Sequence, residues 1–261
     1  MNHRSFFGPT SLLFSTYNSR GALAVFTGEK PFVLQNLSRD IRRCGETRRQ
    51  RVIEILSNPG MWAVLGYRFC RWVYLLQAFW LIKKPLGLVA GVVSLLIQVA
   101  THITLPWRAS IGPGLYIPHT GYIVVNSQAV IGSNCTLAQG VTIGHRAGGR
   151  KRGGGNPVIG DRVYIGPGSA IIGPITVGDD ALIGVGAVVT RSVPPRGVVA
   201  GNPARLLSRR GSFNLIDYPG MDSDPARLAA LAARDVPIAG IPSTSPDRVD
   251  TRTVDSGLHI E

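Results

Sequence analysis

The sequence predicts a mainly β fold: a parallel β-helix over residues 103–207, preceded by a small α-helical segment. Aliphatic residues recur every six positions, and glycine follows many of them. An α-helix does not explain this period, because successive aliphatic side chains would point about 240° apart at 3.6 residues per turn. A flat strand does not explain it either, since glycine recurs too often. A coil of short strands and tight corners fits both observations.

The hexads predict which side chains form the core. Each hexad supplies one side of the coil, and its aliphatic residue points inward to stack on the equivalent residue of the next coil. The predicted core positions are Ile111, Ile117, Ile123, Val125, Ile131, Leu137, Ile143, Ile159, Ile165, Ile171, Val177, Ile183 and Val189. From residue 159 to residue 189 the register is unbroken, which chance would rarely produce.

Two interruptions of the repeat predict where function lies. The phase slips by two residues at "PHTGY", residues 118–122. After Ile143 comes an insertion, "GHRAGGRKRGGGNP", with six glycines and four Lys or Arg residues, which predicts a protruding basic loop. Insertions at corners leave the wall of a coil intact, and functional residues gather on such loops.

The helical segment is expected over residues 46–102. Apolar periodicity predicts helices near 47–57 and 60–82, separated at Asn58-Pro59-Gly60 and followed by a break at Lys83-Lys84-Pro85.

Both ends of the chain lack such a pattern. Residues 1–45 are rich in turn formers without a sustained period, and residues 208–261 are polar and rich in proline. We expect a disordered N-terminal segment and a largely disordered C-terminal tail.

The run from Leu86 to Leu105 carries no formal charge and is long enough to span a membrane. It contains Gln98, Thr101 and His102, and it leads directly into the coil. These features favour a buried helix that covers one end of the domain. A membrane-inserted or surface-lying helix is the alternative.

The amino-acid composition limits the kinds of partner and site that we expect. The net charge is +13, and 24 of the 28 basic residues are Arg, but they are scattered apart from a cluster at 146–152. No groove-reading helix or aromatic and basic platform accompanies them, so we do not expect nucleic-acid binding. Three widely spaced cysteines predict neither a disulfide framework nor a zinc site and fit a reducing cytoplasm. The N-terminus shows no secretory signal.

Four motifs resemble a known family. They are "IGPGLYIPHTGYIVVN", "IGSNCTLAQGVTIG", "PVIGDRVYIGPGSAIIGPITVGDDALIGVGAVV" and "SVPPRGVVAGNPAR". They are similar to the serine O-acetyltransferases and related exopolysaccharide and colanic-acid sugar O-acetyltransferases of the hexapeptide-repeat superfamily. The resemblance implies a left-handed coil, a homotrimer with an active site between each pair of coils, and acetyl transfer from acetyl-CoA to a hydroxyl without a metal.

The resemblance also implies roles for residues. The histidine at the phase slip, His119 here, is the family's general base, and an imidazole is suited to this because it titrates near neutrality. His102 and His145 are weaker candidates. On the acceptor side, Thr104 stands where the serine enzymes carry an acidic residue, and Asn156 stands where they carry a histidine. Both departures fit another hydroxyl acceptor at least as well as serine.

Cofactor contacts in the family follow the outside of the coil, through backbone groups after repeat glycines. The matching positions are Gly166, Pro167, Gly184 and Val185, where Pro167 lacks an N–H donor. Arg205 and Lys151 are the candidate partners of the nucleotide phosphates.

Three functions remain open from the sequence. The first is acetyl transfer to L-serine, as in cysteine biosynthesis. The second is O-acetylation of a saccharide in exopolysaccharide biosynthesis. The third is a β-helix scaffold without catalytic activity, which the missing acidic partner of His119 would favour.

Overall fold

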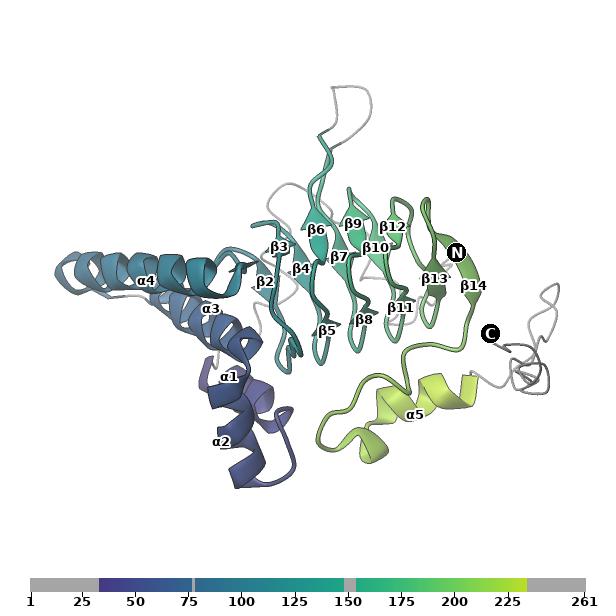
Figure 1. The fold of residues 1–261 in the computed structure, drawn as a ribbon, viewed down its shortest axis with the longest axis horizontal. Helices are drawn as coiled ribbons and strands as arrows, with labels where there is room; N and C mark the ends of the chain where they lie inside the picture. Colours follow the sequence, from purple (N-terminus) through teal and green to yellow (C-terminus); the bar gives the residue numbers. More distant parts are fainter. Residues whose placement is uncertain (1–32, 77, 148–153, 234–261) are drawn as a thin grey trace, which may run out of the picture.

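The computed structural model describes residues 33–76, 78–147 and 154–233. Its centre is a coil of parallel strands, with helices at one end and a short helix beside the other (Figure 1). Lys151 and most of the basic insertion lie outside the described residues, as do residues 1–32 and 234–261.

The coil has three sheets, which the chain visits in turn. The first sheet holds β1 (Ile103–Thr104), β3 (Ile123–Val125), β6 (Thr142–Gly144), β9 (Ala170–Ile172) and β12 (Val188–Val189). The second holds β2 (Ser110–Ile111), β4 (Val130–Ile131), β7 (Val158–Ile159) and β10 (Thr176–Val177). The third holds β5 (Thr136–Leu137), β8 (Tyr164–Ile165), β11 (Leu182–Ile183), β13 (Val198–Ala200) and β14 (Arg205–Ser208). All described neighbours pair in parallel except β13 and β14.

The strand register confirms the phase slip. Ile111 pairs with Ile131, a separation of 20 residues, whereas Val125 pairs with Ile143, a separation of 18. The two extra residues therefore belong to the turn of the coil that contains residues 118–122. All thirteen predicted core positions are buried. The inward face of β3 takes two of them, and Val124 between them points out with 48% of its surface exposed.

In the part of the chain that the structure describes, four helices precede the coil: α1 (Val33–Arg42), α2 (Arg48–Ser57), α3 (Pro59–Leu75) and α4 (Trp80–Thr101). The side chain of Thr47 caps α2 through a capping box with Gln50, and Asn58 caps α3 ahead of its first proline. The expectation of disorder over 1–45 is wrong for residues 33–45, because α1 is held against the coil by Asp40. The predicted break at 83–85 is also wrong, since α3 ends at Leu75 and α4 runs through that segment.

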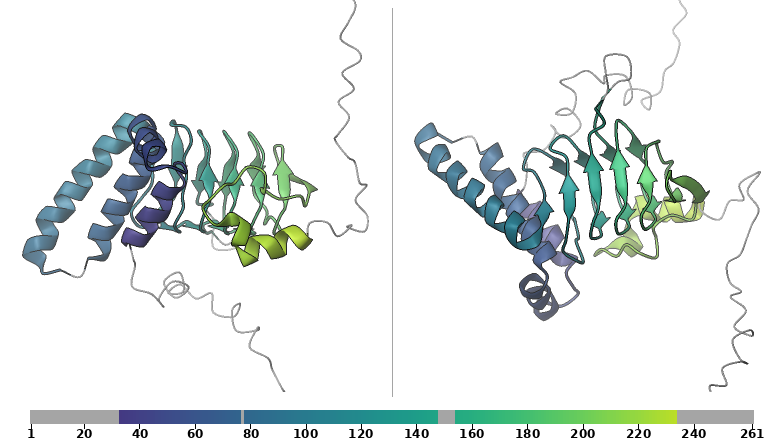
Figure 2. Two further views of the ribbon diagram at one scale, coloured as in Figure 1. Left: turned by 90° about the horizontal axis from the view of Figure 1, so that it is seen from below. Right: turned by 45° about the horizontal axis from the view of Figure 1, so that its top comes forward.

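The expectation of a buried helix over the apolar run is wrong. Only Ala90 and Thr101 of α4 are buried, because α3 covers just one side of the helix. Figure 2 shows α3 and α4 side by side, running away from the coil.

The chain continues to be ordered beyond the coil, so the expectation of a disordered tail is wrong for residues 208–233. A 3-10 turn, η2 (Met221–Ser223), leads into α5 (Pro225–Ala232). Arg227 is buried and donates hydrogen bonds to the carbonyls of Phe213 at 2.8 Å and Ile216 at 3.1 Å. These two apolar residues are buried as well, which anchors the segment.

Candidate active site

The phase slip forms a loop over residues 118–122, between buried Ile117 and β3. His119 is exposed, since the hexad wall has no inward position for the added residues. The backbone turns at Gly121 with φ +114°, a value that favours glycine. The Gly140 N–H donates to the Gly121 carbonyl at 2.8 Å, which ties the loop to the next coil. His119 makes no hydrogen bond with the described residues, so its ring remains available to a substrate.

The helical segment braces the strand that leads into this loop. The Asn58 Nδ2 donates to the carbonyl of Ile117 at 3.0 Å, two residues before His119. The Tyr116 hydroxyl donates to Glu54 Oε1 at 3.0 Å. The loop therefore begins from a fixed backbone.

The end of α4 flanks the other side of the loop. His102 caps α4 in the left-handed region, at φ 54°, and its ring stacks on Tyr122 with centroids 5.3 Å apart. Thr104 pairs with Val124 in the parallel ladder. The Thr104 hydroxyl donates to Gln98 Oε1 at 3.4 Å, so the residue in the position of the family's acid contacts α4. The stacked pair was not predicted, because it depends on a register of 20 residues between β1 and β3.

A line of backbone hydrogen bonds connects the loop with the predicted cofactor positions. The Gly168 N–H donates to the Gln139 carbonyl at 2.9 Å, and the Gly186 N–H donates to the Pro167 carbonyl at 2.8 Å. With the Gly140–Gly121 bond, these contacts stack four turns of the coil at one corner. We call this the site corner, and it comprises residues 118–122, 138–140, 166–168 and 184–186.

The site corner offers unequal contacts to a cofactor. Val185 is 73% exposed and its N–H donates to none of the described residues. Pro167 has no N–H, and its carbonyl already accepts from Gly186. Gly166 and Gly184 donate their N–H groups within the coil, to Ile183 and Val199 carbonyls at 2.8 and 2.7 Å.

Gly166 and Gly184 allow successive turns of the coil to stack closely, rather than offering N–H groups to a cofactor. A Cβ on Gly166 would lie 2.7 Å from the Ile183 carbonyl oxygen, and one on Gly184 would lie 2.9 Å from the Ala200 Cβ. Arg205 lies at the end of the coil, exposed in β14, where its Nη1 donates to the Ala204 carbonyl at 3.2 Å. Val185 is therefore the best placed of the predicted positions to donate a backbone hydrogen bond.

Gln139 also lies on the site corner, although the sequence pattern did not indicate it. Its Oε1 is buried and has no hydrogen-bond partner among the described residues. Its backbone occupies the same place in the coil as Pro167 and Val185, one residue before a glycine with positive φ. That shared place in the repeat is the signal that could have found it.

Asn156 lies on a different corner from His119. The His119 loop leads from the third sheet into the first, whereas Asn156 lies between β6 of the first sheet and β7 of the second. Its Nδ2 donates to Gln128 Oε1 at 2.8 Å, and its Oδ1 is buried without a partner among the described residues. One copy of the chain therefore does not bring these two residues together.

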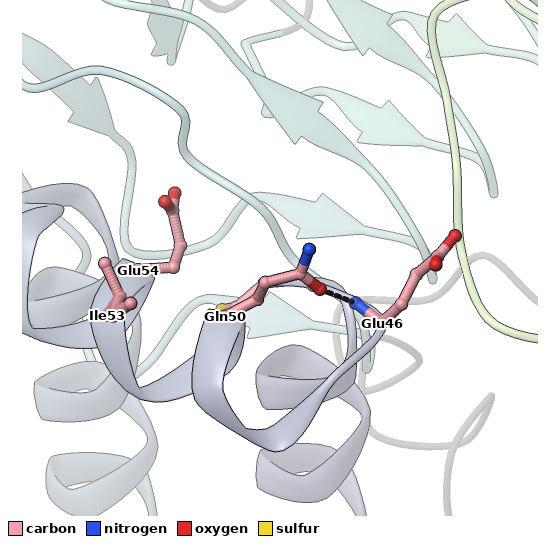
Figure 3. A pocket seen from close by; sticks show the side chains of 6 residues that line it. Glu46, Gln50, Ile53 and Glu54 are labelled. Carbon is pink, nitrogen blue, oxygen red and sulfur yellow. Dashed lines mark hydrogen bonds between the residues drawn. The ribbon is translucent and has the colours of Figure 1, made fainter.

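A cavity of about 480 Å³ lies at α2 and the turn before it. It is lined by Cys44, Gly45, Glu46, Gln50, Ile53 and Glu54 (Figure 3). Gln50 uses its Oε1 to accept from the Glu46 and Thr47 N–H groups in the cap of α2. The Gln50 side chain is therefore used to cap α2. None of the predicted site residues lines the cavity.

The cysteines are not suited to act as nucleophiles. Burial raises the pKa of Cys135 to about 12 and that of Cys44 to about 11, and it also raises the pKa of Cys70. A thiol that stays protonated at neutral pH is a weak nucleophile. The described residues contain no group of three or more His, Cys, Asp and Glu side chains that could hold a metal ion.

We therefore expect Cys44, Cys70 and Cys135 to resist thiol reagents in the folded protein at pH 8. Addition of 5,5′-dithiobis(2-nitrobenzoate) should release almost no thiolate within minutes, and all three thiols should react once urea unfolds the chain. The absorbance of the released nitrothiobenzoate measures this. Rapid reaction of one cysteine in the folded protein would contradict the burial described above.

Comparison with known proteins decides the family. The profile of the bacterial transferase hexapeptide family (six repeats) matches residues 156–191. The chain is 34% identical over 188 residues to the serine acetyltransferase of Mycobacterium tuberculosis, which covers 69% of this chain and 78% of the relative. This chain belongs to the serine acetyltransferase family. The Synechococcus elongatus serine acetyltransferase is 30% identical over 178 residues, with 68% of this chain and 69% of the relative covered.

Solved structures of the serine acetyltransferase family agree with the fold. The soybean enzyme complexed with serine superimposes with a TM-score of 0.56 at 31% identity, covering 68% of this chain and 70% of the soybean chain. The left-handed β-helix with a helical segment before it, implied by the resemblance, is thus confirmed. As a serine acetyltransferase family member, the chain is an acyltransferase whose co-substrate is acetyl-CoA, which removes the scaffold alternative.

Proposed function

We propose that this chain transfers the acetyl group of acetyl-CoA to the hydroxyl of L-serine, with His119 as general base. The observation that supports this most is the place of His119: exposed, at the two-residue slip over residues 118–122, and on the corner that also carries Val185. Both the serine and the thioester can therefore approach the same corner from solvent.

The reaction follows from these groups. His119 accepts the proton of the serine hydroxyl while its oxygen forms a bond to the thioester carbonyl carbon. The carbon–sulfur bond then breaks, and the proton passes from His119 to the leaving thiolate of CoA. Backbone N–H groups of the site corner beside the His119 loop stabilise the negative oxygen of the tetrahedral intermediate. Val185 lies three turns farther along the coil, so its unused N–H is placed to contact acetyl-CoA away from the thioester. No covalent acetyl-enzyme is needed.

We further propose a cytoplasmic homotrimer. Because Asn156 and His119 lie on different corners of one coil, a neighbouring copy is required to bring an Asn156 side chain to each His119 loop. Three flat sheets give the coil faces that suit threefold packing. In this arrangement the half-buried Asn156 lies beside the neighbouring copy's His119 loop, where its side chain contacts the acceptor.

Mixing two inactive variants tests the shared site. We expect His119→Ala and Asn156→Leu to be impaired as separate trimers, and hybrid trimers to regain activity at interfaces that combine an intact His119 with an intact Asn156. Light scattering gives the mass of each assembly. A monomer with full activity, or hybrids without any recovery, would contradict the shared site.

A saccharide acceptor is the second candidate, and Thr104 with Asn156 favours it. Neither side chain can act as the carboxylate or the second histidine that the resemblance implies for serine enzymes. Release of CoA should be followed with L-serine, with free monosaccharides and with nucleotide sugars, and with His119→Ala as the blank. Turnover of serine at least tenfold above any sugar supports the first proposal, and the reverse order supports the second.

A further inference from the structure

The outward face of α4 is apolar apart from Lys84 near its beginning. Its members project from the side of the helix that α3 does not cover, at spacings of three, four and seven residues. We call them the α4 stripe: Leu81, Leu88, Val92, Leu95 and Val99, which are 58%, 72%, 49%, 61% and 66% exposed. No charged residue lies between Pro85 and Thr101. A helix that faces water normally carries its polar residues on this side.

The uncharged polar side chains Ser94, Gln98 and Thr101 of α4 face the protein instead. Gln98 Nε2 donates to Ser94 Oγ at 2.9 Å, and Gln98 Oε1 accepts from Thr104 at 3.4 Å. Thr101 is buried, and its hydroxyl donates to the Ile97 carbonyl at 2.7 Å. These side chains form their hydrogen bonds within the protein. The exposed face can therefore leave water without breaking any of those hydrogen bonds.

The beginning of α4 carries the residues that anchor proteins at a membrane surface. Phe79 and Trp80 are 64% and 55% exposed, with ring centroids 6.0 Å apart. The Lys84 ammonium lies 5.0 Å from the centre of the Trp80 ring, and Lys83 is exposed beside it. Aromatic rings settle at the headgroup level, and lysines there attract anionic lipids.

The anchoring of α3 determines how α4 can meet a bilayer. Among the helices that the structure describes, α4 is long and apolar enough to cross a membrane by length and composition, with a mean hydropathy of 1.7 and 6% of that stretch buried. However, α3 packs along α4, and its Tyr67, Arg68 and Arg71 donate hydrogen bonds to carbonyls of residues 107–112. Because α3 is thus fixed to the coil, α4 meets a bilayer sideways, with one face.

We propose that the α4 stripe lies in the boundary between headgroups and acyl chains of an anionic phospholipid membrane. The apolar side chains supply the attraction, since each leucine that leaves water contributes to binding in proportion to its buried area. Lys83 and Lys84 add an electrostatic contribution, and the overall charge of +13 acts in the same direction. The coil remains in water and keeps its site corner open to acetyl-CoA. This inference is independent of the acceptor that the enzyme uses.

Vesicle flotation with the full-length protein tests the inference. We expect the wild-type chain to float with vesicles of equal parts phosphatidylcholine and phosphatidylglycerol. The double variant Leu88→Glu/Leu95→Glu should bind at least tenfold more weakly. The matched control is Ile53→Glu/Leu56→Glu on α2. The wild-type side chains at these positions are 53% and 70% exposed. This control variant should bind almost as the wild type does.

The electrostatic contribution has its own variant and control. Lys83→Glu/Lys84→Glu should weaken flotation with phosphatidylglycerol several-fold and reduce its dependence on salt, since screening shortens with ionic strength. Arg48→Glu/Arg49→Glu changes the net charge equally, on exposed positions of α2, and should have a much smaller effect. If the Lys83/Lys84 and Arg48/Arg49 double variants lost the same amount of vesicle binding, the lysines would act only through the net charge. That result would overturn this part of the inference.

Two outcomes would overturn the inference as a whole. The wild-type chain could stay at the bottom of the gradient, or the stripe variant could float as well as the wild type. In the first case, a loss of mass of the stripe variant in light scattering would assign the stripe to contact between copies. Far-ultraviolet circular dichroism and CoA release should be unchanged in the stripe variant, which separates these outcomes from misfolding and from failure of the proposed function.

Discussion

Replacement of His119 by alanine should lower kcat by roughly 10²–10⁴-fold, the usual contribution of a general base. The hydroxyl of the acceptor then has to lose its proton to water during the attack on the thioester. Affinity for acetyl-CoA should stay within a few-fold, because the proposed contacts to the cofactor lie along residues 166–168 and 184–186. CoA release at saturating acceptor, followed over a range of acetyl-CoA concentrations, measures both quantities.

Stability gives an internal control for this variant. His119 is exposed and makes no hydrogen bond with the described residues, so His119→Ala should unfold at the same urea concentration as the wild type. His145→Ala removes another exposed histidine, at the start of the basic insertion, and should retain activity within a few-fold. If His119→Ala retained full activity on the true acceptor, the assignment of the base would be wrong.

The second large effect concerns the ion pair that fixes α1 and α3 to the coil. Arg68 Nε and Nη2 donate to the Asp40 carboxylate at 2.7 and 3.1 Å, with both side chains buried. Asp40 Oδ1 also accepts from the N–H groups of Gly114 and Leu115, at 2.7 and 2.9 Å. Burial raises the pKa of Asp40, and the bonds to Arg68 and the two backbone groups oppose that rise.

Asp40→Ala should therefore lower the free energy of unfolding by about 3–5 kcal/mol, since it leaves the Arg68 charge buried without its partner. Urea unfolding measures the loss. Asp222→Ala, at an exposed carboxylate of η2, should change the same quantity by less than about 0.5 kcal/mol. The double variant Asp40→Leu/Arg68→Met removes both charges and should be more stable than Asp40→Ala. A loss in Asp40→Ala as small as that of the control would show that the helices are held by other contacts.

The coil could be predicted because its signal is local and repeated. Each hexad contributes the same inward aliphatic residue, and a slip of two residues is visible against that regular background. The position of His119 followed from it. Periodicity could not predict the stack of His102 on Tyr122, nor the Gln139 oxygen that has no partner within the described ranges. Both depend on which turns of the coil lie side by side.

The flanking segments were predicted less well, because distant contacts order them. The hydrogen bonds that hold α1 join Asp40 to residues 114 and 115, which are more than 70 positions away. No local sequence pattern predicts such contacts. Likewise Arg227 orders the segment after the coil by bonding to Phe213 and Ile216. For α4, composition predicted burial, whereas the arrangement of α3 leaves its apolar face outside.

The antiparallel pairing of β13 with β14 limits how copies of the chain can associate. A parallel coil presents unpaired backbone groups at both ends, and a second coil in the same register would extend it without end. Here β14 runs in the opposite direction, with a shift in register at Val198 and Val199, and offers no matching template. At the other end, the Arg68 guanidinium donates hydrogen bonds to the carbonyls of Ile111 and Gly112, so these carbonyls already have partners. Growth into a fibre is thereby disfavoured, and the sides of the coil remain the surfaces through which copies can meet.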